Sequence, residues 1–109
     1  MGKYLMIVQA QALPGHEAEL PRLYDEVHFR EMCAIPGIIS ARRYSVTDSS
    51  PMQPAIPNLA IYEIEADDIA SVSLELYRRT RAGEMTRLET LDRATMKMLF
   101  YEQKSEVTD

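Results

Sequence analysis

Three side chains that could take part in acid–base chemistry fall on one face of a predicted helix. Tyr24, His28 and Glu31 are spaced at i, i+4 and i+7, and side chains with this spacing are neighbours on an α-helix. A nearby carboxylate favours the charged form of a histidine and fixes its tautomer, which suits proton transfer near neutral pH. The alternative is that His28 lies at the edge of the core and is satisfied by Glu31 or a backbone carbonyl. We therefore consider His28 a candidate catalytic acid or base, with Tyr24 and Glu31 as candidate substrate-binding residues.

A second pair of candidate binding residues follows in a predicted strand. Arg42 and Tyr44 occupy alternate positions, so they share a face and could present a guanidinium and a phenol to a carboxylate or phenolate ligand. Arg43 points the other way, so only one arginine of the pair can serve a given pocket. The alternative is an exposed arginine whose aliphatic stem lies across the sheet.

Other reactive residue types give little further indication of chemistry. Cys33 is close to the predicted end of a helix, where the helix dipole disfavours a thiolate, and His16 lies in a Pro-Gly turn where solvation is expected. Two histidines and one cysteine cannot build a structural zinc site. The sequence also lacks a phosphate-binding loop, a dinucleotide fingerprint and a serine nucleophile elbow. We predict neither a cofactor nor a metal.

The overall composition narrows the choice of partner and compartment. A chain of 109 residues is expected to form a single domain over 1–109. Its net charge of −5 argues against nucleic acid or an anionic membrane as the main partner. A single cysteine suits a reducing compartment, and the apolar run Tyr4–Val8 is too short for a signal sequence or a membrane span. We expect a cytoplasmic protein.

Hydrophobic periodicity and breaker residues predict four strands and two helices. The first helix runs to about Ala34; either it begins near Leu20 with Pro21 in its first turn, or it bends at Pro21. The second begins at Asp67-Asp68 and breaks around Gly83. A further short helical piece could follow. The predicted strands are Lys3–Ala12, Gly37–Thr47, Asn58–Ala66 and Thr95–Gln103, the predicted loop is Asp48–Pro57, and the further helical piece is Glu84–Arg93.

The same periodicity predicts which side chains share a face. In the first helix, the buried stripe is expected to contain Leu20, Leu23, Tyr24, Val27, Glu31, Ala34 and Ile35. Alternation in the strands predicts one face with Tyr4, Met6, Val8 and Ala10, and another with Ile38, Ser40, Arg42, Tyr44 and Val46.

The predicted order, βαββαβ, is typical of an α+β, ferredoxin-like fold. Its four-stranded antiparallel sheet carries both helices on one face. The strands are apolar on both faces, and two helices can cover only one. A second copy could cover the other face, so we predict a homodimer in which sheet packs on sheet.

Three segments of the chain resemble the EthD-like group of dimeric α/β-barrel proteins. They are PGHEAEL (Pro14–Leu20), LYDEVH (Leu23–His28) and AIPGIISARRY (Ala34–Tyr44). The resemblance implies a ferredoxin-like protomer whose sheets form a barrel in the dimer. It also implies a small-molecule pocket between helices and sheet, lined by a histidine at the position of His28. The group often has an aromatic residue at the position of Leu23 and a second histidine at that of Met32, so a two-histidine mechanism is not expected here.

Two functional hypotheses follow from the residues and the resemblance. In the first, the dimer binds an aromatic or polyketide-like molecule, and His28 transfers a proton in a reaction of the cyclase, lyase or cofactor-free monooxygenase type. In the second, the protein is a non-catalytic homodimeric ligand-binding or accessory protein. The sequence does not decide between an enzyme and a binding protein.

Overall fold

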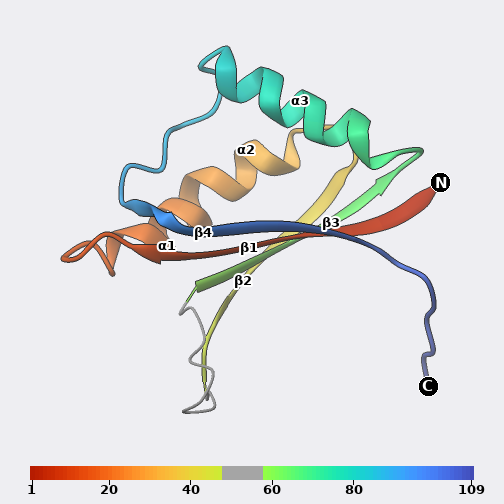
Figure 1. Ribbon diagram of the computed structural model, residues 1–109, viewed down its shortest axis with the longest axis horizontal. Helices are drawn as coiled ribbons and strands as arrows, with labels where there is room; N and C mark the ends of the chain where they lie inside the picture. Colours follow the sequence, from red (N-terminus) through yellow and green to blue (C-terminus); the bar gives the residue numbers. More distant parts are fainter. Residues whose placement is uncertain (48–57) are drawn as a thin grey trace.

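The computed structural model describes residues 1–47 and 58–109 (Figure 1). Its strands are β1 (Gly2–Ala12), β2 (Ile38–Ser45), β3 (Asn58–Ala66) and β4 (Leu91–Glu102). The first helical segment consists of α1 (Glu19–Leu23), the π-helical turn η1 (Tyr24–His28) and α2 (Phe29–Cys33), and the second is α3 (Ile69–Arg81). In these described parts, no helix is long and apolar enough to cross a membrane. The loop predicted over Asp48–Pro57 lies outside the described residues.

The four strands form one antiparallel sheet in the order β2-β3-β1-β4. The central strand β1 pairs on both sides, so that Met6 lies opposite Tyr62 of β3 and opposite Phe100 of β4. Both helical segments lie on one side of this sheet (Figure 1). The predicted α+β, ferredoxin-like βαββαβ fold is therefore confirmed.

The core lies between the sheet and the helical segments. Alternate residues of β1 and β3 point into it, as the strand periodicity predicts, while α1, η1 and α2 supply apolar side chains from above. The largest fully buried side chains are Tyr62, Met6, Leu20, Met32, Ile35 and Ile64. Two residues of the first helical segment, Leu20 and Met32, thus lie as deep as the central strands.

The first helical segment begins as one of the two alternatives predicts but buries a different stripe. Pro21 lies in the first turn of α1. Backbone N–H groups in a first turn make no intrahelical hydrogen bond, so a proline there costs none. Beyond Tyr24, Ile35 is buried as predicted, but Met32 is buried in place of the half-buried Glu31 and Ala34 is exposed, so the predicted stripe is wrong at these positions. The cause is the π turn, which contains one residue more per turn and shifts the later buried positions by one.

Strand β2 contains an irregularity that reverses its faces. Its pairing with β3 shifts by one residue between Ile38 and Ser40. Ile38 is buried beneath the helices, whereas Arg42 and Tyr44 lie on the opposite face of the sheet, away from the helices. Arg42 and Tyr44 share a face as predicted, but the prediction that Ile38 lies on that face is wrong, because one extra residue in a strand turns every later side chain over.

Helix α3 begins at the predicted acidic cap. The carboxylate of Asp68 accepts a hydrogen bond from the backbone N–H of Ser71 at 2.7 Å. Val72 is buried against the core, while Tyr77 is exposed. The helix therefore packs through a narrow stripe.

The predicted helical piece over Glu84–Arg93 is wrong. Gly83 has a φ of 75°, which ends the helical run, and β4 already begins at Leu91. The backbone N–H of Leu13 donates to the carbonyl of Thr90 at 2.8 Å, so the end of this segment is held beside the end of β1. A local pattern does not reveal such a long-range hydrogen bond.

Large apolar side chains are exposed on the face of the sheet that lies away from the helices. They come from β2 and β4 and are Ile39, Tyr44, Leu99 and Tyr101. We name this surface the open face. Its apolar character agrees with the expectation that both faces of the sheet require a cover.

Candidate functional site

His28 is the last residue of the π turn η1. The backbone N–H of Phe29 donates to the carbonyl of Tyr24, five residues earlier, which defines the widened turn. Single π turns within α-helices are rare and are frequently found at functional sites. This turn places Tyr24, His28 and Phe29 close enough to contact one another and β3, so the local backbone distortion coincides with the predicted catalytic residue.

The ring of His28 is surrounded by aromatic side chains. Its centroid lies 5.5 Å from that of Tyr24 and 6.3 Å from that of Tyr62, both in edge-on arrangements. Phe29 contacts the same two tyrosines, with centroids 5.5 Å from Tyr24 and 5.6 Å from Tyr62. The Nδ1 atom of His28 is buried and has no hydrogen-bond partner among residues 1–47 and 58–109. Because buried polar atoms are nearly always paired, this atom is a natural contact point for a bound molecule.

The protonation state of His28 follows from its surroundings. Burial lowers the pKa of the imidazole from its ordinary value of 6.5, and the negative charge of Glu31 opposes this effect to a smaller extent. The imidazole is therefore neutral at neutral pH. A neutral imidazole can accept a proton on one nitrogen while it carries a hydrogen on the other.

Glu31 acts on His28 only through its charge. Its carboxylate accepts hydrogen bonds from the backbone N–H of Thr86, at 2.9 and 3.1 Å, and from the Thr86 hydroxyl at 2.9 Å. The predicted histidine–carboxylate pairing thus takes the form of a nearby charge without a hydrogen bond. Glu31 instead ties α2 to the segment that precedes β4.

Tyr62, which we did not single out from the sequence, is the second polar group at this site. Its side chain is 1% exposed, and its hydroxyl has no hydrogen-bond partner in the described parts of the chain. Burial raises the pKa of Tyr62, so the phenol is neutral, and burial likewise raises the pKa of Tyr24. One sequence feature could have identified Tyr62: it places a phenol between Ala60 and Ile64 on an otherwise apolar strand face.

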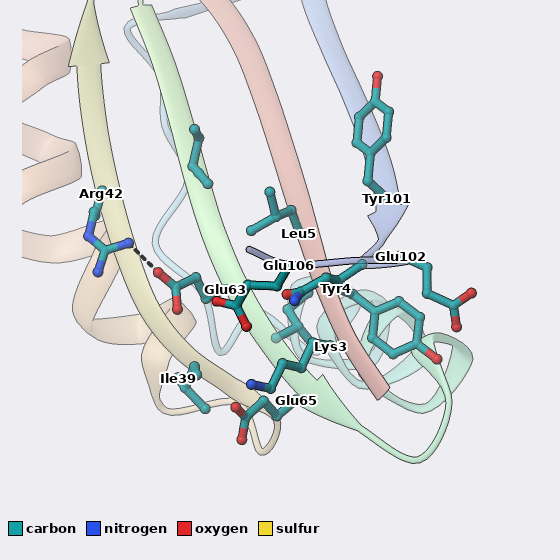
Figure 2. Close-up of a pocket in the computed structure, with 13 residues that line it drawn as sticks. Lys3, Tyr4, Leu5, Ile39, Arg42, Glu63, Glu65, Tyr101, Glu102 and Glu106 are labelled. Carbon is teal, nitrogen blue, oxygen red and sulfur yellow. Dashed lines mark hydrogen bonds and ion pairs between the residues drawn. The ribbon is translucent and has the colours of Figure 1, made fainter. Parts of the chain in front are cut away.

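Arg42 and Tyr44 lie apart from this aromatic group. Arg42 pairs with Glu63 of the neighbouring strand on the open face, and Figure 2 shows the two side chains extending toward each other. Hydrogen bonding to Glu63 raises the pKa of Arg42. The sheet separates both Arg42 and Tyr44 from His28, so the candidate site residues do not converge on one pocket.

A surface hollow on the open face measures about 490 Å³ (Figure 2). Side chains from all four strands and the C-terminal tail surround it, among them Lys3, Tyr4, Arg42, Glu63, Tyr101 and Glu106. A smaller hollow of about 210 Å³ lies over α1 and η1 and is lined by Glu19, Arg22, Leu23 and Glu26. Neither hollow is lined by Tyr24, His28 or Glu31.

Cys33 and the remaining ligand-type residues do not form a further site. Cys33 is exposed at the end of α2, and partial burial raises the pKa of its thiol, so the thiolate is disfavoured. Within residues 1–47 and 58–109, no three histidine, cysteine or acidic side chains are placed to hold a metal ion.

Comparison with solved structures identifies several proteins of the same fold. A provisionally assigned monooxygenase from Shewanella loihica PV-4 superposes with a TM-score of 0.64 at 16% identity, over 97% of this chain and 99% of that one. An EthD family protein from Bacillus halodurans C-125 gives 0.63 at 15% identity, over 95% and 100%. A dimeric ferredoxin-like protein from an uncultured marine organism gives 0.61 at 14% identity, over 98% and 100%.

These similarities confirm the ferredoxin-like fold, which the chain shares with an EthD family protein and with a dimeric ferredoxin-like protein. At 14–16% identity they show the fold alone. No protein-family model and no curated protein sequence matches the chain. A shared fold does not imply a shared function, so the residues around His28 are what bear on function.

Proposed function

We propose that the protein is a homodimer that binds a small, mainly apolar molecule beside His28, and that His28 transfers a proton to or from that molecule. The observation that carries this proposal is the buried, unpaired Nδ1 of His28 at the end of a π turn. An unpaired polar atom in a packed core lowers stability, and such costs are typical of functional sites.

The chemistry proposed for His28 is general base catalysis. With its hydrogen on Nε2, the neutral imidazole has a lone pair on Nδ1 that can accept a proton from a carbon next to a carbonyl group. The electron pair of that C–H bond then moves toward the carbonyl oxygen and gives an enolate, and the proton returns from Nδ1 to the same or another atom. Exclusion of water by Tyr24 and Phe29 would favour such a transfer.

The proposed dimer is formed through the open face. Ile39, Leu99 and Tyr101 expose apolar surface there, and the larger hollow is on the same side. A second copy packed sheet to sheet would remove this surface from water and enclose the hollow. One of the structurally similar proteins is itself described as dimeric, which supports the same arrangement here.

A second candidate function is ligand binding without catalysis. It is favoured by the close packing of the Tyr24 and Tyr62 rings against the imidazole, with centroids 5.5 and 6.3 Å away, and neither of the two hollows described above is lined by His28. In this case, a ligand would enter by displacing an aromatic ring and would leave chemically unchanged.

Deuterium exchange separates the two candidates without knowledge of the natural substrate. The probe is 2-tetralone, a bicyclic aromatic ketone with an acidic C–H group, incubated in D₂O and followed by proton NMR. We expect the protein to accelerate exchange at C1 about 10²-fold over buffer. His28→Gln should abolish the acceleration. The control is His16→Gln, which changes the half-exposed histidine just before α1 and should keep the acceleration.

Unchanged exchange in His28→Gln would contradict the role of His28 as the base. Binding of 2-tetralone without any exchange would favour the non-catalytic alternative.

A further inference from the structure

We infer that the molecule bound beside His28 is uncharged, and that the Tyr62 hydroxyl donates a hydrogen bond to its carbonyl or hydroxyl oxygen. This inference depends on the proposed function and specifies the chemical class of its ligand. It assigns to Tyr62 the role of a ligand-binding residue.

The position of Tyr62 supports a direct contact. The residue lies in the middle of β3, and its ring packs edge-on against both His28 and Phe29. Its hydroxyl is buried and unpaired among the described residues, as is Nδ1 of His28. A ligand oxygen that accepts from the hydroxyl would satisfy a group that is otherwise left without a hydrogen bond.

The charged side chains described near the site are already engaged elsewhere and so offer no free counter-ion to the ligand. The guanidinium of Arg43 is bound to Asp25, and Arg42 lies on the open face. The carboxylate of Glu31 already accepts three hydrogen bonds from Thr86. Burial also keeps His28 and Tyr62 neutral by lowering the pKa of the first and raising that of the second.

An ionic ligand would therefore lose its hydration without gaining a counter-ion. Removing a charge from water in this way is strongly unfavourable unless the charge is paired. An uncharged molecule avoids this loss, and the faces and edges of Tyr24 and Phe29 favour a planar, ring-containing body. The class that fits is a neutral cyclic ketone, quinone or enol.

A pair of bicyclic probes of similar size tests the charge requirement. The neutral probe is 2-tetralone and the anionic probe is 2-naphthoate, and calorimetry gives both dissociation constants for the wild-type dimer. We expect 2-tetralone to bind at least about tenfold more tightly than 2-naphthoate.

Tyr62→Phe tests the hydrogen bond itself. Loss of one hydrogen bond should weaken 2-tetralone binding about tenfold. The same variant should raise the midpoint of thermal unfolding by about 4 °C, because it removes a buried hydroxyl that has no hydrogen-bond partner among residues 1–47 and 58–109. Tyr77→Phe, which removes an exposed tyrosine hydroxyl on α3, is the matched control and should leave 2-tetralone affinity unchanged.

Three results would overturn the inference. They are 2-naphthoate binding as tight as that of 2-tetralone, a Tyr62→Phe variant with unchanged 2-tetralone affinity, and a Tyr62→Phe variant with a lower unfolding midpoint. If His28-dependent exchange of 2-tetralone persists in such a case, the proposed function stands and only the inference fails. If the wild-type protein binds neither probe, both fail.

Discussion

Arg43 and Asp25 form a two-point ion pair between the sheet and the π turn. The guanidinium donates from Nε to one carboxylate oxygen at 3.1 Å and from Nη2 to the other at 3.0 Å. Asp25 belongs to η1 and Arg43 to the edge strand β2, so the pair fixes the turn that carries His28. A parallel, two-point contact restricts orientation as well as distance.

Arg43→Ala is expected to loosen this attachment. Because the Asp25 side chain is 50% exposed, water weakens the pair, and we expect the free energy of unfolding to fall by only about 0.5–1 kcal/mol. The NMR signals of His28 should shift at the same time, since its turn loses an anchor.

The matched control is Arg22→Ala, because Arg22 makes a longer contact of 3.7 Å with Glu26 on the same helical segment and both side chains are more exposed. Identical effects of the two variants on the His28 signals would contradict the anchoring role.

Glu31→Gln is expected to lower the pKa of His28 further. The negative charge of Glu31 favours the imidazolium and so partly offsets the effect of burial. Glutamine removes that charge while its amide oxygen can still accept a hydrogen bond from Thr86. An NMR titration of the His28 ring measures the change, with His16 as an internal reference. A pKa of His28 that stays constant or rises would show that Glu31 does not act through its charge.

The stability of the protein should depend on the titration of His28. Because burial lowers its pKa in the folded state, the unfolded chain binds a proton more readily. Acid therefore stabilises the unfolded chain, and the free energy of unfolding should fall as the pH drops below the ordinary histidine value of 6.5. The slope from one such group is at most about 1.4 kcal/mol per pH unit.

Urea unfolding between pH 5 and 8 measures this dependence. Other groups also titrate at the acidic end, so the informative quantity is the difference between the wild-type protein and His28→Gln. Parallel stability curves for the wild-type protein and His28→Gln would mean that the pKa of His28 is the same in both states.

The open face gives a separate prediction about assembly. Ile61 faces away from the helices in the centre of the sheet, so Ile61→Glu would place a charge in the proposed interface. Light scattering should give a dimer mass for the wild-type protein and a monomer mass for this variant. Leu74→Glu, on the exposed side of α3, is the control and should remain dimeric. A folded wild-type monomer at micromolar concentration would contradict the proposed dimer.

The sequence was sufficient to predict the fold because its local signals agree with one another. The alternation along β1 places Met6 and Val8 in the core, and Asp68 marks the start of α3. Pro21 also lies where helix geometry tolerates it, in the first turn. Each of these features depends on a few neighbouring residues, so periodicity and capping rules can identify it.

The arrangement of the site could be predicted only in part, because it depends on two insertions that leave no local pattern. The π turn changes which residues after Tyr24 are buried in the core. The register shift in β2 places Arg42 on the face of the sheet opposite to that of Ile38. Both add one residue to a regular repeat. The role proposed for Tyr62 could not be predicted either, because a tyrosine in a strand is more often a core residue than a binding group. Its hydroxyl, unpaired among the described residues, is visible only in three dimensions.

The most direct test of the central claim is the NMR response of the two histidines to 2-tetralone. The chain has only His16 and His28, so their ring signals can be assigned with one variant of each. We predict that saturating 2-tetralone shifts the His28 ring signals and leaves those of His16 in place. A spectrum in which 2-tetralone binds but the His28 signals do not move would contradict the account.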